Sequence, residues 1–229
     1  MSPPRLGFLG TGWIGRHRLA GIAASGAGEI AAIVDPSPDC AREAQALAPD
    51  AAILPDLDSM RAANLDGLVI ATPSALHADQ AIAALEAGLA VFCQKPLGRT
   101  AQETRRVVEA AEAADRLLGV DFSYRHTRAA EALAALIEED ALGDIFAADL
   151  TFHNAYGPDK PWFHDAALSG GGCVIDLGVH LVDLALWLTG FPAVDKVKAR
   201  LFAKGKPFAR GAGTVEDYAL ARLDLATGA

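Results

Sequence analysis

Three glycines at fixed spacing, Gly10, Gly12 and Gly15, follow a short apolar run near the N-terminus. The run, Leu6–Leu9, is predicted to be a strand, and a helical pattern starts at Trp13. A strand that passes through such a turn into a helix opens a parallel β-α-β unit. Gly10 permits the turn, Gly12 lets a pyrophosphate approach the backbone, and Gly15 lets the helix pack on the strand. The alternative interpretation is an ordinary structural turn.

Short apolar runs alternate with longer helical patterns as far as about residue 124. The runs are continuously apolar, as expected of parallel strands buried on both faces. The predicted strands are Leu6–Leu9, Glu29–Val34, Gly67–Ala71, Ala90–Cys93 and Leu117–Phe122. The predicted helices are Trp13–Ala24, Pro38–Leu47, Ala75–Ala87 and Thr100–Ala114, with N-caps at Ser74 and Thr100. We therefore predict an α/β Rossmann domain over residues 1–124.

The second half, residues 125–229, follows a different pattern. After a predicted helix, Thr127–Glu139, apolar and polar residues alternate over 146–152, which is typical of a strand with one covered face. Lys196–Phe202 and Thr214–Leu225 are also predicted strands. This half is therefore predicted to be an α+β domain with a mainly antiparallel open sheet.

The sequence ends in Thr-Gly-Ala directly after a strong strand pattern. A Thr-Gly pair at this place is typical of a hairpin turn, but no partner strand follows. A long edge strand pairs readily with another chain. We therefore expect either a truncated molecule or a homodimer or homotetramer in which a second subunit covers the edge.

The composition limits the classes of partner. The formal net charge of −9 argues against binding to nucleic acid or to an anionic membrane. The three scattered cysteines, Cys40, Cys93 and Cys173, suggest neither disulfides nor a zinc site, so we expect no metal and a reducing cytoplasm. No apolar run reaches the ~18 residues that a membrane span requires.

Asp35 ends the second predicted strand, 20 residues after Gly15. A carboxylate at this place accepts hydrogen bonds from the ribose hydroxyls of a dinucleotide and repels a 2′-phosphate. The N–H groups at the helix start, at Trp13 and Ile14, are expected to face the pyrophosphate. The predicted cofactor is therefore NAD, with NADP as the alternative. Asp35 could instead simply cap the loop.

Two further segments carry ionisable groups. Lys95 follows the predicted strand Ala90–Cys93, and the carboxyl ends of parallel strands open onto the cofactor crevice. Asp176, His180 and Asp183 share one face of an apolar helical pattern that resembles a core helix. Such groups need partners or a function. His180 is either satisfied by neighbouring carboxylates or handles a proton.

Oxidation of a secondary alcohol requires a hydride acceptor and a base. Histidine titrates near neutrality and suits the base, so His180 is the predicted general acid/base. Asp176 could orient the imidazole or bind a hydroxyl group. Lys95 could stabilise negative charge on the alcohol oxygen. This hypothesis requires Lys95 and His180 to share one pocket.

Taken together, these segments resemble the glucose–fructose oxidoreductase/inositol dehydrogenase (Gfo/Idh/MocA) family. The matching segments are GFLGTGWIG, ATPSALH at 71–77, CQKPL at 93–97, the Tyr124-Arg125 pair and GGGCVIDLGVHLVDLALWLTG. The resemblance implies NAD(P)-dependent oxidation or reduction of sugars, polyols and related compounds. It makes Lys95 the lysine of the Glu-Lys-Pro motif, often before a cis proline, and Asp176 and His180 the Asp-x-x-x-His pair at the substrate.

The resemblance also implies cofactor contacts. They are expected from Thr72, Pro73 and His77 beside the nicotinamide ribose, and from Gln94 and Trp162. Gln94 stands where the family usually has glutamate, which puts the orientation of Lys95 in question. The family's chains are also commonly longer than this one.

Arg125 and His153 are the further predicted substrate contacts. An arginine could bind a carboxylate and shift the substrate from a polyol to a sugar acid. Two other functions stay open. One is a non-catalytic NAD-binding regulator, suggested by Gln94 and by the short C-terminus, and the other is NAD-assisted glycoside cleavage without net NAD consumption.

Overall fold

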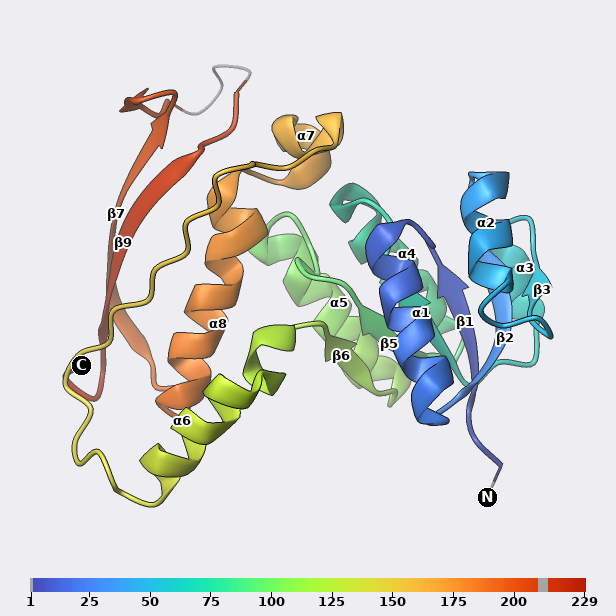
Figure 1. Cartoon of the computed structure of the whole chain (residues 1–229), viewed down its shortest axis with the longest axis horizontal. Helices are drawn as coiled ribbons and strands as arrows, with labels where there is room; N and C mark the ends of the chain where they lie inside the picture. Colours follow the sequence, from blue (N-terminus) through green and yellow to red (C-terminus); the bar gives the residue numbers. More distant parts are fainter. Residues whose placement is uncertain (1, 210–213) are drawn as a thin grey trace. The chain divides into compact units, whose positions relative to one another are not determined.

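The computed structural model describes residues 2–209 and 214–229, and the chain forms two compact units (Figure 1). Unit 1 ends at Asp121 and unit 2 begins at Phe122, just before the predicted boundary at residue 124.

Unit 1 contains a six-stranded parallel sheet with the order β3-β2-β1-β4-β5-β6. Its strands are β1 (Arg5–Leu9), β2 (Glu29–Val34), β3 (Ala52–Ile53), β4 (Gly67–Ile70), β5 (Ala90–Cys93) and β6 (Leu118–Val120). The strand order reverses between β1 and β4, where Leu9 pairs with Ile70. Ligands of such sheets bind outside the carboxyl ends of the strands at this switch point. The predicted Rossmann fold is confirmed.

Five helices connect these strands in the described part of unit 1: α1 (Trp13–Ser25), α2 (Pro38–Gln45), α3 (Leu57–Ala62), α4 (Ser74–Glu86) and α5 (Ala101–Ala114). Thr100 caps α5 as predicted, because its side chain accepts a hydrogen bond from the Glu103 N–H. The predicted cap at Ser74 is wrong by one residue, since Pro73 precedes the helix. The short elements β3 and α3 were not predicted, because elements of two and six residues show no clear period.

Helices cover both faces of the sheet, which explains its continuously apolar strands. On one face, Phe8 and Ile33 pack with Leu19 of α1 and Ala41 of α2. The other face has the larger core, in which strand residues pack with α4 and α5. It includes Ile70, Val91, Ala81, Leu85 and Val107. Both cores fix the strand ends from which the loops of the candidate site emerge.

Unit 2 combines helices with a three-stranded antiparallel sheet of order β8-β7-β9. Its helical elements are η1 (Ser123–His126), α6 (Arg128–Glu138), η2 (Pro161–His164), α7 (Ala166–Ser169), η3 (Val174–Gly178) and α8 (Val179–Leu188). Its strands are β7 (Val194–Ala203), β8 (Lys206–Pro207) and β9 (Tyr218–Leu225). The predicted α+β class with an antiparallel sheet is confirmed, as is the turn after β9, where Gly228 has a φ of +92°. Of the strand predicted over 214–225, residues 214–217 precede β9.

The strand predicted over residues 146–152 is wrong. The structure shows irregular chain there, and Phe146 is 82% exposed. Alternating residues define which face of a strand would be covered, but a strand also needs a hydrogen-bonded neighbour. The described sheet of unit 2 does not include this segment.

The helical segment Ala166–Leu188 is long and apolar enough to cross a membrane by length and composition alone. The expectation that no stretch meets that criterion is therefore wrong. The finding is weak evidence for a membrane span, because core helices pass the same test. The segment also carries Asp176, His180 and Asp183, and ionisable groups are costly in lipid.

Candidate active site

The three glycines of the first turn have different surroundings. A Cβ atom on Gly15 would lie 2.2 Å from the Gly10 carbonyl oxygen, and one on Gly10 would lie 2.7 Å from the backbone of Ala71 and Thr72. A Cβ on Gly12 would meet nothing within 4 Å. The N-terminus of α1 has no side-chain cap. The turn therefore leaves open space beside a helix start whose amides suit an anion, and it fits a dinucleotide pyrophosphate.

Asp35 binds the same turn from the end of β2. Its carboxylate accepts hydrogen bonds from the Thr11 N–H at 2.6 Å, the Thr11 hydroxyl at 3.2 Å and the Ser37 N–H at 2.8 Å. The capping role considered for Asp35 is thus present. A carboxylate has about four acceptor sites, so these bonds are compatible with a ribose contact as well.

The other predicted cofactor residues near the turn differ in exposure. Trp13 is 64% exposed, and its ring lies 4.6 Å from that of His17 at an interplanar angle of 57°; Ile14 is half-buried. In the loop after β4, the Thr72 hydroxyl donates to the side-chain oxygen of Gln80 at 2.6 Å. Pro73 is the N-cap of α4. These loops follow adjacent strands and can border one ligand.

His77, the third predicted cofactor residue of this segment, is buried in unit 1. Its imidazole is 1% exposed, and its Nδ1 and Nε2 atoms each lie 2.7 Å from a backbone oxygen, of Pro96 and Thr72 respectively. Burial lowers the pKa of His77; the two carbonyl groups oppose that shift, and the Lys95 ammonium adds to it. The ring therefore joins two loops of unit 1.

Lys95 is half-buried and follows β5, and its peptide bond with Pro96 is cis, as the resemblance implies. The preceding Gln94 is buried, and its amide donates to the Asp121 carboxylate. Asp121 also accepts a hydrogen bond from Arg18 of α1. An amide beside a carboxylate forms a normal donor–acceptor pair, whereas glutamate at this position would place two carboxylates together.

In unit 2, His180 is buried and lies in an aromatic stack. The Tyr124 ring lies parallel to the imidazole at 4.3 Å between centroids, and Phe122 meets it edge-on at 6.3 Å. Burial raises the pKa of Tyr124, and the Asp176 carboxylate adds to this rise. Asp176, Tyr124 and His180 therefore form one cluster in this unit.

Asp183 on the same helix pairs with Arg125. It is buried and accepts hydrogen bonds from both the Nε and an Nη atom of Arg125. This contact raises the pKa of Arg125, which also lies 5.5 Å from the Phe122 ring centre and 5.1 Å from that of Phe191. A substrate carboxylate would have to share Arg125 with Asp183.

The glycine run before His180 packs against Glu216. A Cβ on Gly172 would lie 1.8 Å from the Glu216 carbonyl oxygen. That oxygen accepts from the Cys173 N–H, and the Glu216 side chain accepts from the N–H groups of Gly172 and Val174. Glu216 thus holds the start of the helical segment that carries Asp176.

The two remaining predicted site residues of unit 2 lie outside this cluster. His153 is exposed in the irregular chain. Trp162 is half-buried in η2 and stacks on Phe163 with 3.8 Å between ring centres. Their roles stay predictions.

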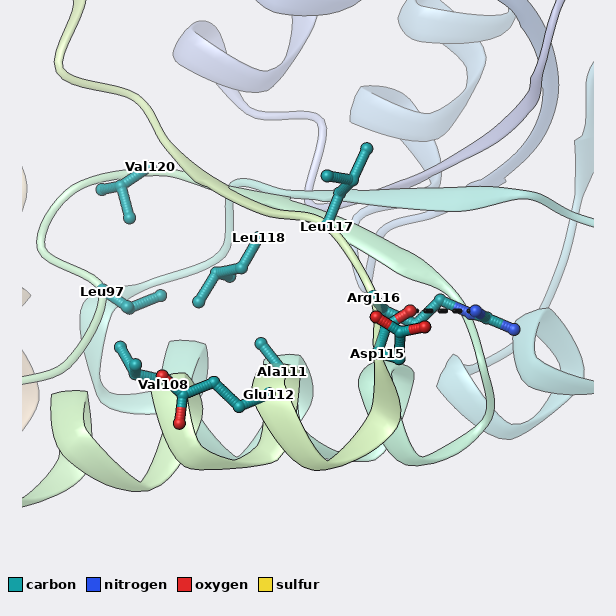
Figure 2. Close-up of a pocket in the computed structure, with 9 residues that line it drawn as sticks. All are labelled: Leu97, Val108, Ala111, Glu112, Asp115, Arg116, Leu117, Leu118 and Val120. Carbon is teal, nitrogen blue, oxygen red and sulfur yellow. Dashed lines mark hydrogen bonds between the residues drawn. The ribbon is translucent and has the colours of Figure 1, made fainter.

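A groove in unit 1 lies between α5 and the edge strand β6 (Figure 2). Apolar side chains line most of it, with charged groups at Glu112, Asp115 and Arg116. None of the predicted site residues lines it.

The sequence did not predict that Asp121 and Glu216 support the site, nor that Tyr124 stacks on His180. Tyr124 belongs to the Tyr-Arg pair that carries the family resemblance, so a signal was present. Asp121 and Glu216 act on groups 27 and 44 residues away, and no local pattern marks them.

Both halves of the chain match models of one protein family. A family model described as the GFO_IDH_MocA oxidoreductase family with an NAD-binding Rossmann fold matches residues 5–122. A model of the GFO/IDH/MocA C-terminal domain matches residues 130–229.

Among curated proteins, D-glucoside 3-dehydrogenase of Escherichia coli (strain K12) is 31% identical over 202 residues, or 80% of this chain and 58% of that protein. Levoglucosan dehydrogenase of Pseudarthrobacter phenanthrenivorans is 38% identical over 137 residues, or 56% of this chain and 34% of that protein. The solved structure of levoglucosan dehydrogenase with NADH and levoglucosan matches with a TM-score of 0.83 and 28% identity, covering 99% of this chain and 65% of that one. The chain thus spans less than two thirds of each of these proteins.

Proposed function

The chain belongs to the Gfo/Idh/MocA family of NAD-binding oxidoreductases, and on that premise we propose that the protein is a dehydrogenase or reductase of a sugar, polyol or related compound. NAD is the proposed cofactor and NADP the alternative. Bound NAD supplies the hydride acceptor or donor. The names of the similar proteins, a glucoside dehydrogenase and a levoglucosan dehydrogenase, support a carbohydrate substrate.

One observation carries the proposal: the chain combines an open glycine turn with a buried imidazole that stacks on a tyrosine close to a carboxylate. A Cβ on Gly12 would meet empty space, and the turn beside it is closed by Gly10 and Gly15. His180 is stacked on Tyr124, and the Asp176 carboxylate contributes to the raised pKa of that tyrosine. The first element suits a dinucleotide, and the second suits proton transfer.

Each reacting side chain has a proposed role. His180 accepts the hydroxyl proton during oxidation and returns it during reduction. Asp176 binds a neighbouring hydroxyl group or orients the imidazole. Lys95 donates a hydrogen bond to the reacting oxygen and stabilises its negative charge. Arg125 and His153 stay proposed substrate contacts, with Arg125 already engaged by Asp183.

The proposal is tested with the 229-residue chain, NAD or NADP, and a panel of sugars and polyols, by the absorbance of the reduced nicotinamide. We expect turnover with at least one member. His180→Ala should lower kcat by roughly 10²–10⁴ while NAD affinity changes little. Unchanged turnover in this variant would show that His180 is not the general base.

Two other outcomes identify the alternative functions. NAD binding without turnover on any substrate would support the regulator. However, Gln94, which motivated that alternative, has a structural explanation in its hydrogen bond with Asp121. Release of a glycosidic leaving group without accumulation of reduced cofactor would support NAD-assisted cleavage.

We also propose that the protein is a homo-oligomer that covers the sheet of unit 2. On one face of that sheet the apolar side chains of Val197, Ala199 and Ala221 are exposed, that of Val197 at 62%. Contiguous exposed apolar surface is typical of an interaction site. Light scattering that gives the mass of a single chain at micromolar concentration would contradict this proposal.

A further inference from the structure

Lys95 stands between two buried neighbours, and the backbone around it is anchored on both sides. On the N-terminal side, the Gln94 N–H donates to the Ile70 carbonyl oxygen at 2.8 Å, and the Gln94 amide donates to Asp121. On the C-terminal side, the Pro96 carbonyl oxygen meets the buried ring of His77 at 2.7 Å. The side chain that bears the proposed charge-stabilising ammonium is thus attached to a fixed stretch of chain.

We propose that His77 is a positioning residue for Lys95. The ring lies on α4 and reaches the two loops that follow β4 and β5, through Nε2 to Thr72 and through Nδ1 to Pro96. It therefore ties the segment after Lys95 to the predicted cofactor loop. Because both ring nitrogens face backbone oxygens of unit 1, His77 acts inside the protein instead of on a ligand.

The inference rests on the proposed function, which gives Lys95 its role. A displacement of about 1 Å at a catalytic group can lower a rate by about 100-fold. A residue that fixes the backbone next to such a group therefore affects turnover without touching the substrate.

The two nitrogens allow the two loops to be tested separately. Asparagine places its amide nitrogen near the position of Nδ1, and glutamine places its own near that of Nε2. His77→Asn is therefore expected to retain a polar contact with Pro96 and lose the one with Thr72. His77→Gln is expected to do the reverse, and His77→Phe removes both contacts.

If the contact with Pro96 positions Lys95, His77→Gln and His77→Phe lower kcat by about 10- to 100-fold, and His77→Asn lowers it several-fold less. Gln80→Met is the matched control, because Gln80 also lies on α4 and accepts from the Thr72 hydroxyl but does not reach Pro96. We expect it to leave kcat unchanged. Equal losses in His77→Asn and His77→Gln, or full activity in His77→Phe, would overturn the inference.

A second measurement does not depend on turnover. Lys95 is the only lysine in residues 1–121, so its ¹³C-dimethylated amine gives the one side-chain NMR signal from this part of the chain, beside that of the N-terminal α-amine. Lys95→Arg assigns that signal by removing it. His77→Gln and His77→Phe should shift or broaden it, whereas Gln80→Met should not.

The two readouts separate the inference from the proposed function. A shifted Lys95 signal in a protein without any turnover would support the contact and contradict the function. An unshifted signal in His77→Phe would contradict the contact even in an active enzyme.

Discussion

Each unit of the molecule buries an aspartate at its site, and the two are held in different ways. Asp183 in unit 2 is 8% exposed and receives two hydrogen bonds from a single guanidinium group, that of Arg125. Asp121 in unit 1 is 6% exposed and receives one from Arg18 and one from Gln94. The carboxylate with two separate donors can lose one of them and remain paired. The comparison therefore predicts that unit 2 depends more strongly on its arginine.

The largest expected effect is that of Arg125→Met. The change leaves Asp183 as a buried charge without its guanidinium, which costs about 3–5 kcal/mol of unfolding free energy. Arg18→Met is the matched control, and because Gln94 still donates to Asp121, we expect a loss of about 1–2 kcal/mol.

Two cysteines allow each unit to be followed separately. Cys93 is fully buried in unit 1, and Cys173 is half-buried in unit 2. Thiol labelling after equilibration in urea, read by peptide mass spectrometry, gives an unfolding midpoint for each. Arg125→Met should move the Cys173 midpoint, and Arg18→Met should move the Cys93 midpoint less. Equal shifts would show that the second donor in unit 1 contributes nothing.

The next effect is that of Gln94→Glu, which restores the residue usual in the family. In this chain it places a second carboxylate beside Asp121, and Arg18 can neutralise one of the two. We expect a loss of about 1–3 kcal/mol at the Cys93 midpoint. Adding Asp121→Asn exchanges the amide and the carboxylate, so most of the loss should be recovered. If Gln94→Glu alone is as stable as the wild type, the contact with Asp121 does not explain why this chain has glutamine at position 94.

The two units also differ in how far the sequence predicted them. In unit 1 the signals are local. Strands buried on both faces appear as continuous apolar runs, and the glycine spacing reflects positions such as Gly15 that have no room for a side chain. In unit 2, a strand was predicted over residues 146–152 from alternation alone. Alternation contains no information about a neighbouring strand, and in the described sheet none pairs with this segment.

The residues of the site divide along the same line. The glycines, Asp35, Lys95 and His180 have local sequence signals, because each follows a strand end or lies at a helical spacing, and their roles stay predictions. The groups that hold them could not, because Gln94 with Asp121 and Gly172 with Glu216 are contacts between distant positions. His77 was predicted as a cofactor contact, and only coordinates place its ring against two backbone oxygens.

A smaller effect separates the glycine turns of the two units. Space beside Gly12 is open, whereas space beside Gly172 is filled by the Glu216 backbone. Gly12→Ala should therefore fold normally but weaken NAD binding by about tenfold, or about 1.4 kcal/mol. Gly21→Ala, on the same helix and also in open space, should leave NAD affinity unchanged. Calorimetric titration with NAD measures the affinity of both variants. Equal affinities would show that the pyrophosphate does not bind at this turn.

The smallest expected effect is a pH dependence of unit 1 that originates at His77. Burial lowers its pKa below the ordinary 6.5, so between the two values the unfolded chain binds a proton that the folded unit does not. The contribution of His77 to stability is therefore fully present above about pH 6.5 and decreases as the pH falls through that value toward the lower pKa of the folded state. The Cys93 midpoint of the wild type should decline over this range more than that of His77→Phe, and comparison at each pH cancels the changing reactivity of the thiol. Two carbonyl oxygens close to the ring favour its protonated form. If they outweigh burial, the wild type will instead gain stability over His77→Phe as the pH falls, and the sign of the difference thus decides which of the two forces controls the ring.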